Sequence, residues 1–162
     1  MTDIKDRVSI HEELAARYDS SNDYLWGITR GHQIEVRVKS DEITLPKDDL
    51  VTFSVDLIPR YRCKNKRKMV PLEYYGDFAE SWFKIRMANV LKVVSINTIV
   101  GYDFIPARQR HNRKSFTTPY ATISGMAEIV DRDELKKLML NGIGEMKAYG
   151  FGLINIKEIQ YA

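Results

Sequence analysis

The stretch that decides the fold reads DRDELKKLMLNGIGEMKAYGFGLINIKEI and spans residues 131 to 159. Asp131 is suited to cap a helix, and Glu134, three residues later, completes the reciprocal pattern of a capping box. Gly142 ends the predicted helix, because glycine readily closes a helix C-terminus. The apolar and β-branched run from Leu153 to Ile159 then predicts the closing strand of a sheet.

Four further elements are predicted upstream of that helix. They are a strand over 50–58, a helix over 76–90, a strand or a bent pair of strands over 91–104, and a strand over 121–130. The helix is predicted from apolar and polar residues that recur near the helical period, namely Phe78, Trp82, Ile85 and Asn89. The resulting order, strand, helix, strand, strand, helix, strand, is that of a ferredoxin-like fold.

The beginning of the chain predicts a shorter version of the same unit. Val8 to Tyr18 predicts a helix with one partly apolar face, formed by Ile10, Leu14 and Ala15. A hairpin follows, with strands over 24–29 and 34–39 and a turn over 30–33. Pro46 to Asp49 predicts a turn or linker.

We therefore expect two units. Residues 1–47 would form a shortened N-terminal ferredoxin-like unit, and residues 48–162 a C-terminal ferredoxin-like domain that includes the glycine-rich loop. The predicted fold class is α+β, with tandem ferredoxin-like (RRM-like) folds, antiparallel sheets and a truncated first fold.

The positive charge is concentrated in two windows that hold no acidic residue, 57–72 and 104–127. They contain ten of the 25 Lys and Arg residues, so the rest of this chain of net charge +3 is acidic. Such asymmetry is typical of a protein that binds a polyanion, although two solvated loops would look the same. The predicted RNA-binding residues in these windows are Arg60, Arg62, Lys64, Lys66, Arg67, Lys68, Arg108, Arg110, His111, Arg113 and Lys114.

Composition excludes several other classes of protein. None of the apolar runs approaches the ~20 residues that a membrane-spanning helix needs, and the start lacks a signal peptide. The single cysteine, Cys63, cannot form an internal disulfide, so we expect a cytoplasmic protein. Three histidines without metal-ligand spacing predict no metal site, and no motif predicts a nucleotide cofactor.

The loop between the last helix and the last strand, GIGEMKAYGFGL, contains four glycines within eleven residues. Glycine allows the backbone to approach a phosphate closely, and Lys147 adds a positive charge. We therefore predict that Gly142, Gly144, Lys147 and Gly150 contact RNA. A merely structural connection is the alternative, and the loop is not a dinucleotide or P-loop fingerprint, in which the glycines precede a helix.

This loop resembles the C-terminal glycine-rich loop of the CasE family of CRISPR-associated repeat endoribonucleases. The resemblance continues upstream through Ser124–Asp131, Ser81–Phe83 and the segment KRKMVPL, residues 66–72. Near the start, Ile10-His11 and the later Tyr24–Trp26 are similar to the family's helix-borne histidine and its following strand.

The resemblance implies a tandem ferredoxin-like protein that binds a stem-loop RNA and cleaves it without metal. Attack by a ribose 2′-hydroxyl would give a 2′,3′-cyclic phosphate, with His11 as the catalytic residue and the basic segments and glycine loop holding the RNA. Subunits of a CRISPR effector complex are implied partners. Two features depart from the family: its opening strand is expected to be missing, and Val8 stands where a tyrosine is common.

Other readings stay open. The chain could be a non-cleaving RNA-binding protein on the same scaffold, such as a repressor or an accessory factor of a mobile element. An open sheet edge could instead pair with another chain, which includes a homodimer. His111 is the reserve catalytic candidate. Tyr61 and Tyr120 are suited to stack on unpaired bases if they are exposed, although such aromatic residues more often belong to a core.

Overall fold

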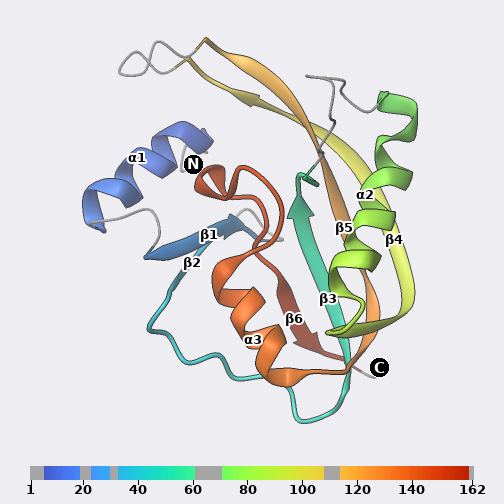
Figure 1. Ribbon diagram of the computed structural model, residues 1–162. Coiled ribbons are helices and arrows are strands. Elements are labelled where there is room, and N and C mark those ends of the chain that lie inside the picture. The colour runs from blue at the N-terminus through green and yellow to red at the C-terminus, as the bar shows by residue number, and fades with distance from the viewer. Residues whose placement is uncertain (1–5, 19–22, 30–32, 61–70, 108–113, 161–162) are drawn as a thin grey trace.

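The computed structural model describes residues 6–18, 23–29, 33–60, 71–107 and 114–160. These ranges hold ten elements along the chain (Figure 1): α1 (Arg7–Arg17), β1 (Tyr24–Ile28), β2 (Ile34–Val38), β3 (Leu50–Leu57), α2 (Leu72–Met87), β4 (Leu91–Ile105), β5 (Phe116–Ile129), α3 (Arg132–Asn141), the 3-10 helix η2 (Lys147–Tyr149) and β6 (Asn155–Glu158). Within the described residues, no helix is long and apolar enough to cross a membrane.

The predicted ferredoxin-like order over residues 50–159 is confirmed. The larger sheet has the strand order β4-β5-β3-β6, and all neighbouring strands are antiparallel. Helices α2 and α3 lie on the same face of this sheet (Figure 1). Alternate residues of β3 point into the core beneath the helices, where Phe53 stacks on Phe83 of α2 with 5.3 Å between ring centroids.

The last helix begins and ends as predicted. The side chain of Asp131 accepts a hydrogen bond from the Glu134 amide, and Gly142, with φ 74°, follows the helix. The amide of Asp131 itself donates to the Val90 carbonyl at 3.4 Å. The Asp131 side chain therefore caps the start of α3. The reciprocal bond of the predicted capping box, from the Asp131 amide to the Glu134 side chain, is replaced by the bond to the Val90 carbonyl.

The residues whose spacing predicts α2 are not the ones that it buries. The buried residues are Tyr75, Ala79, Phe83 and Met87, whereas Ile85 is 79% exposed. The helix begins at Leu72, before the predicted start, so that Gly76 lies inside it rather than at its first position. A Cβ at Gly76 would lie 3.3 Å from a methyl group of Val100, so the glycine lets the helix approach β4 closely.

Strands β4 and β5 are longer than the rest of the sheet. The region predicted as one strand or a bent pair is one strand, with a bulge between Val93 and Ser95. Strand β5 begins at Phe116, earlier than predicted. Because β3 ends opposite Ala121, residues 101–105 and 116–120 form a two-stranded arm beyond the sheet, which Figure 1 shows projecting from the body. Pro119 is tolerated there because no third strand needs its missing amide hydrogen.

The first unit contributes α1 and the antiparallel hairpin β1–β2. Ile10 and Leu14 of α1 pack with Tyr24 and Trp26 of β1, and Trp26 is completely buried. The predicted linker is held against the start of α3, because Arg132 donates to the carbonyls of Pro46 and Lys47. The boundary between residues 47 and 48 stays a prediction.

Candidate functional site

His11 lies on α1 and faces inward, with only 7% of its surface exposed. Its imidazole contacts the ring of Tyr149 in η2, with 5.4 Å between centroids and 53° between planes. The predicted catalytic histidine and the predicted RNA-binding loop, which are far apart in sequence, therefore meet in the structure.

The loop owes its path to its glycines. All four have positive φ, from 74° to 89°, and Met146 adopts φ 57°. A Cβ at Gly150 would lie 2.5 Å from the Trp26 ring and 2.7 Å from a guanidinium nitrogen of Arg7. Such distances are far below normal carbon contacts, so only glycine fits between these two side chains.

Side chains of the first unit bind the carbonyl groups of this loop. Arg7 donates to the carbonyls of Tyr149 and Gly150 at 2.9 and 3.1 Å. The indole of Trp26 donates to the Ala148 carbonyl at 2.9 Å. The loop backbone is thus fixed from the side of α1 and β1.

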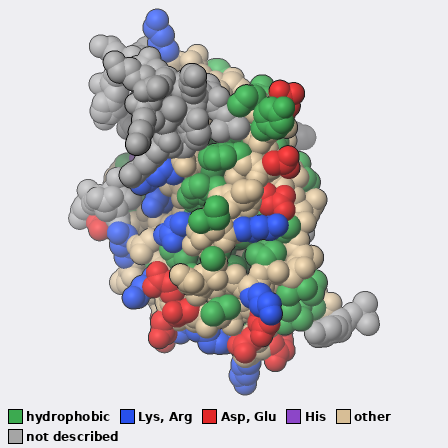
Figure 2. All heavy atoms as spheres, turned by 45° about the vertical axis from the view of Figure 1, so that its right-hand side comes forward, with side chains coloured by type: hydrophobic (Ala, Val, Ile, Leu, Met, Phe, Trp, Pro, Cys, Tyr) green, Lys and Arg blue, Asp and Glu red, His purple; other side chains and the backbone are tan. Residues whose placement is uncertain are grey.

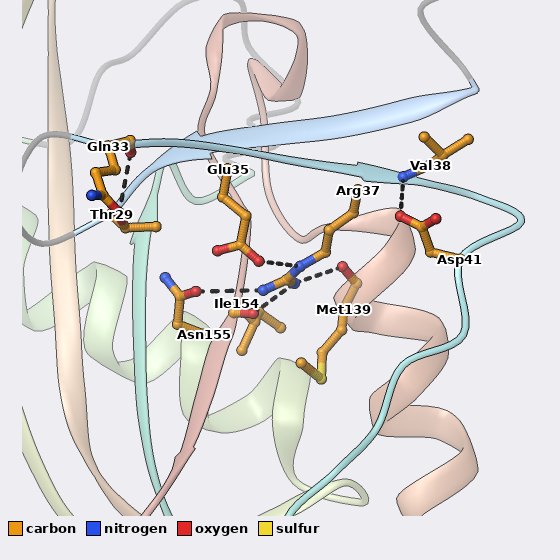
Figure 3. Close-up of polar contacts among 9 residues, drawn as sticks. All are labelled: Thr29, Gln33, Glu35, Arg37, Val38, Asp41, Met139, Ile154 and Asn155. Carbon is orange, nitrogen blue, oxygen red and sulfur yellow. Dashed lines mark hydrogen bonds and ion pairs between the residues drawn. The ribbon is translucent and has the colours of Figure 1, made fainter.

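A second arginine holds the two ends of the loop. Arg37 of β2 donates to the carbonyls of Met139 and Ile154, at 2.9 and 2.8 Å, and forms an ion pair with Glu35 at 3.0 Å (Figure 3). Met139 lies in α3 and Ile154 just before β6, so one buried guanidinium spans the loop entry and exit. Sequence reasoning missed this residue, because an arginine in an alternating strand looks solvent-exposed.

Arg7 connects three parts of the molecule. Besides its bonds to the loop, its guanidinium lies 4.1 Å from the centre of the Phe151 ring and forms an ion pair with Asp103 of the arm. It lies one helical turn before His11 and is 6% exposed. The histidine helix, the glycine loop and the arm are therefore positioned by one buried cation.

The amide groups of the loop fall into two sets. Six already donate to carbonyls of the protein, namely those of Gly142, Ile143, Glu145, Tyr149, Gly150 and Gly152. A second set forms no hydrogen bond within the described parts of the chain: Gly144, Met146, Lys147 and Ala148. The backbone of Met146 has the left-handed conformation, and the right-handed 3-10 turn η2 begins at Lys147. Successive residues of opposite hand form a concave backbone surface that is suited to bind an anion. These four amides are therefore the loop donors that remain for a phosphate.

The described cations of the predicted RNA-binding set are Arg60, Lys114 and Lys147. Arg60 forms an exposed ion pair with Glu145 at 2.8 Å, Lys147 Nζ donates to the Asn141 carbonyl at 3.2 Å, and Lys114 is exposed just before β5. The remaining members lie outside the described residues: Arg62, Lys64, Lys66, Arg67, Lys68, Arg108, Arg110, His111 and Arg113.

Tyr120 agrees more with the core alternative than with an exposed residue that stacks on bases. Its ring is half-buried and packs against Phe151 at 5.4 Å between centroids. Burial raises the pKa of its hydroxyl, the carboxylates of Asp56 and Asp103 raise it further, and Arg7 lowers it. A cavity of about 350 Å³ between the two units is lined in part by Tyr120, Asp56, Asp103 and Arg7. Tyr61 lies outside the described residues.

The model of a family described as CRISPR-associated protein matches residues 14–158. Among solved structures, Cas6e from Escherichia coli K-12 has 17% identity and a TM-score of 0.66, over 95% of this chain and 93% of that chain. Thermus thermophilus Cse3, solved with an RNA representing a pre-cleavage complex, has 14% identity and a TM-score of 0.65, over 94% and 89%. A chain of a CRISPR RNA-guided surveillance complex has 20% identity and a TM-score of 0.69, over 96% and 94%.

No curated protein sequence matches the chain at a significant level. The solved structures nevertheless share its α+β fold with antiparallel sheets, in agreement with the tandem ferredoxin-like arrangement predicted from the sequence. The family match covers almost the whole chain, and it confirms the CasE resemblance of the glycine loop and its upstream segments. This chain belongs to the family of CRISPR-associated proteins, and it has the fold of Cas6e and Cse3.

Proposed function

We propose that the protein binds a stem-loop RNA of CRISPR origin and cleaves it without a metal ion. The observation that carries this proposal is the contact of buried His11 with Tyr149 of the glycine-rich loop. Family membership supports it, as does the fold shared with a CRISPR endoribonuclease solved bound to a 19-nucleotide RNA. The similarity to a chain of a surveillance complex supports a further role as a subunit of an RNA-guided effector assembly.

In the proposed mechanism, His11 acts in general acid–base catalysis. Histidine suits this work because its reference pKa of ~6.5 is close to neutrality. A 2′-hydroxyl loses its proton and attacks the adjacent phosphorus, the bond to the 5′-oxygen breaks, and that oxygen takes up a proton. The products are a 2′,3′-cyclic phosphate and a 5′-hydroxyl end.

The protein's other residues would position the RNA. The available amides of the loop and the side chain of Lys147 face the phosphate backbone in this proposal. The predicted basic residues of the segment between β4 and β5, of which the structure describes Lys114, would bind the stem. Holding the reacting atoms in line supplies much of the rate enhancement of such a site.

The experiment compares wild type with His11→Ala on the RNA that copurifies with the protein, resynthesised with a 5′ label. In EDTA, we expect wild type to cleave and His11→Ala to bind equally but to cleave at least ~10²-fold more slowly in single turnover. A single 2′-deoxy substitution at the cleaved nucleotide should block the reaction. Normal cleavage by His11→Ala would remove the histidine from the mechanism.

A non-cleaving RNA-binding protein is the second candidate. The observation that favours it is Val8, which is buried on α1 where the resemblance implies a tyrosine. It predicts that wild type binds the copurified RNA with strong salt dependence, a log–log slope of about −0.7 to −0.9 per phosphate contact, and leaves it uncut. The same labelled RNA distinguishes the two functions.

A further inference from the structure

A cavity of about 440 Å³ opens between the C-terminal half of α2 and the glycine loop. It is lined by Arg60, Trp82, Arg86, Lys147 and the loop backbone from Gly142 to Gly144. Three of these side chains are cations, and one is a large aromatic ring. Neither Trp82 nor Arg86 belongs to the RNA-binding set predicted from the sequence.

The aromatic ring is fixed in place. Trp82 is half-buried and packs against the core beneath α2, next to the fully buried Phe83. One part of the indole is therefore anchored while another lines the cavity. A ring held in this way offers a flat apolar surface at little further cost in side-chain freedom.

The cations around the ring carry charge that the described structure neutralises only in part. Arg60 pairs with Glu145, and both side chains remain about half exposed, at 51% and 45%. Arg86, one turn after Trp82, forms no ion pair or hydrogen bond with the residues that the structure describes. Figure 2 shows Lys and Arg side chains close to hydrophobic ones on one face of the molecule.

This combination fits one chemical class of ligand. Cations bind a phosphodiester, and an exposed indole stacks on a base, a contact that needs no particular base identity. Inside a stem both faces of a base are already stacked on neighbouring pairs, and a base pair at the end of a stem is too large to enter this cavity with its partner, so the ligand is an unpaired nucleotide. We infer that this cavity binds an unpaired nucleotide of the RNA, with its phosphate on Arg86, Arg60 and Lys147 and its base against Trp82.

The position of the cavity relates this nucleotide to the reaction. Lys147 lines the cavity, and Tyr149, two residues later in the same short helix η2, contacts His11. The unpaired nucleotide therefore lies within a few nucleotides of the bond that His11 would act on. This inference rests on the proposed RNA binding, and it specifies which part of the RNA the cavity beside the glycine loop binds.

The test measures the affinity of the copurified RNA for Trp82→Leu and Arg86→Gln. Lys137→Ala, on the exposed face of α3 and outside the cavity, is the matched control. Base–aromatic stacking and a phosphate contact each predict roughly a tenfold loss of affinity. The loss for Trp82→Leu should disappear when one unpaired nucleotide of the RNA is made abasic.

A fluorescence measurement keeps the test independent of folding defects. Trp26 is fully buried, so quenching of tryptophan emission by RNA should come from Trp82 and be absent in Trp82→Phe, which keeps a packed ring. If wild type binds no RNA, the proposed function fails. If wild type binds RNA but its emission is unchanged and both cavity variants behave like Lys137→Ala, only this inference is overturned.

Discussion

Arg7 of α1 forms a partly buried ion pair with Asp103 of β4, which lies 96 residues later in the chain. The same guanidinium binds the Tyr149 and Gly150 carbonyls, so this one pair joins the histidine helix to both the loop and the arm. A lysine in its place would keep the charge but could not reproduce the fork of donors.

Arg7→Lys should therefore lower the cleavage rate more than it lowers stability. We expect the free energy of unfolding to fall modestly, while Arg7→Ala, which removes the hydrogen bonds to the loop and leaves the partly exposed Asp103 without its cation, should lose roughly 2 kcal/mol. Arg17→Ala, in the last turn of the same helix and exposed, is the control. Urea unfolding and single-turnover cleavage are the two measurements. Equal rates for Arg7→Lys and wild type would show that the fork does not position His11.

The Tyr149 ring should matter for the orientation of His11. Tyr149→Phe keeps the ring contact and should cleave like wild type. Tyr149→Ala removes it and should slow single-turnover cleavage about tenfold, the order expected for a misplaced acid–base group, without changing RNA affinity as much. If Tyr149→Phe is already as slow as His11→Ala, the hydroxyl and not the ring is the essential group.

Gly150 should not tolerate a side chain. Gly150→Val combines a positive φ with a clash against Trp26 and Arg7, and we expect thermal unfolding to occur at clearly lower temperature, with a loss of at least ~1–3 kcal/mol. Lys147→Ala, on the exposed surface of the same loop, should keep its stability and bind RNA more weakly, with a salt slope reduced by about 1. A fully stable Gly150→Val would contradict the packing described here.

We expect the buried hydroxyl of Tyr75 to make the protein less stable at alkaline pH. Its hydroxyl is buried and donates to the Pro119 carbonyl at 3.1 Å, and burial raises the pKa of this group to about 12. In the unfolded chain the hydroxyl ionises near pH ~10, so the unfolded state loses its proton first. The stabilisation is complete below that pH and is lost as the pH rises towards 12.

The measurement is urea unfolding from pH 8 to 12, with Tyr75→Phe as the comparison. The stability difference between wild type and the variant should be constant up to about pH 10 and decrease above it, in total by roughly 1–3 kcal/mol. A difference that does not change with pH would mean that Tyr75 ionises equally easily in the folded chain.

Local signals account for what could be predicted from the sequence. Asp131 and Gly142 mark the two ends of α3 by chemistry that acts within a few residues, and the strand and helix order follows from similar signals. The buried face of α2 could not be chosen in this way, because Phe78 and Trp82 are as apolar as the buried Tyr75 and Phe83. Packing against the sheet decides between them.

The missed residues of the site share one property: their partners are distant in sequence. Arg7 and Arg37 look like ordinary surface cations until the folded chain brings Asp103, Met139 and Ile154 to them. Arg86 likewise becomes part of a cavity only when the glycine loop lies beside α2. No pattern within a short window of sequence contains this information.

The length of the arm formed by residues 101–105 and 116–120 can change in defined steps. Each residue of an antiparallel strand spans about 3.4 Å, and side chains alternate between the two faces. Deleting two residues from each strand would shorten the reach by about 6.8 Å and preserve the facing of Ile105 and Phe116 at the end of the arm, whereas deleting one from each would turn them to the opposite side. The length of the arm can therefore change by an even number of residues in each strand without altering which way its end faces and without changing the sheet below it.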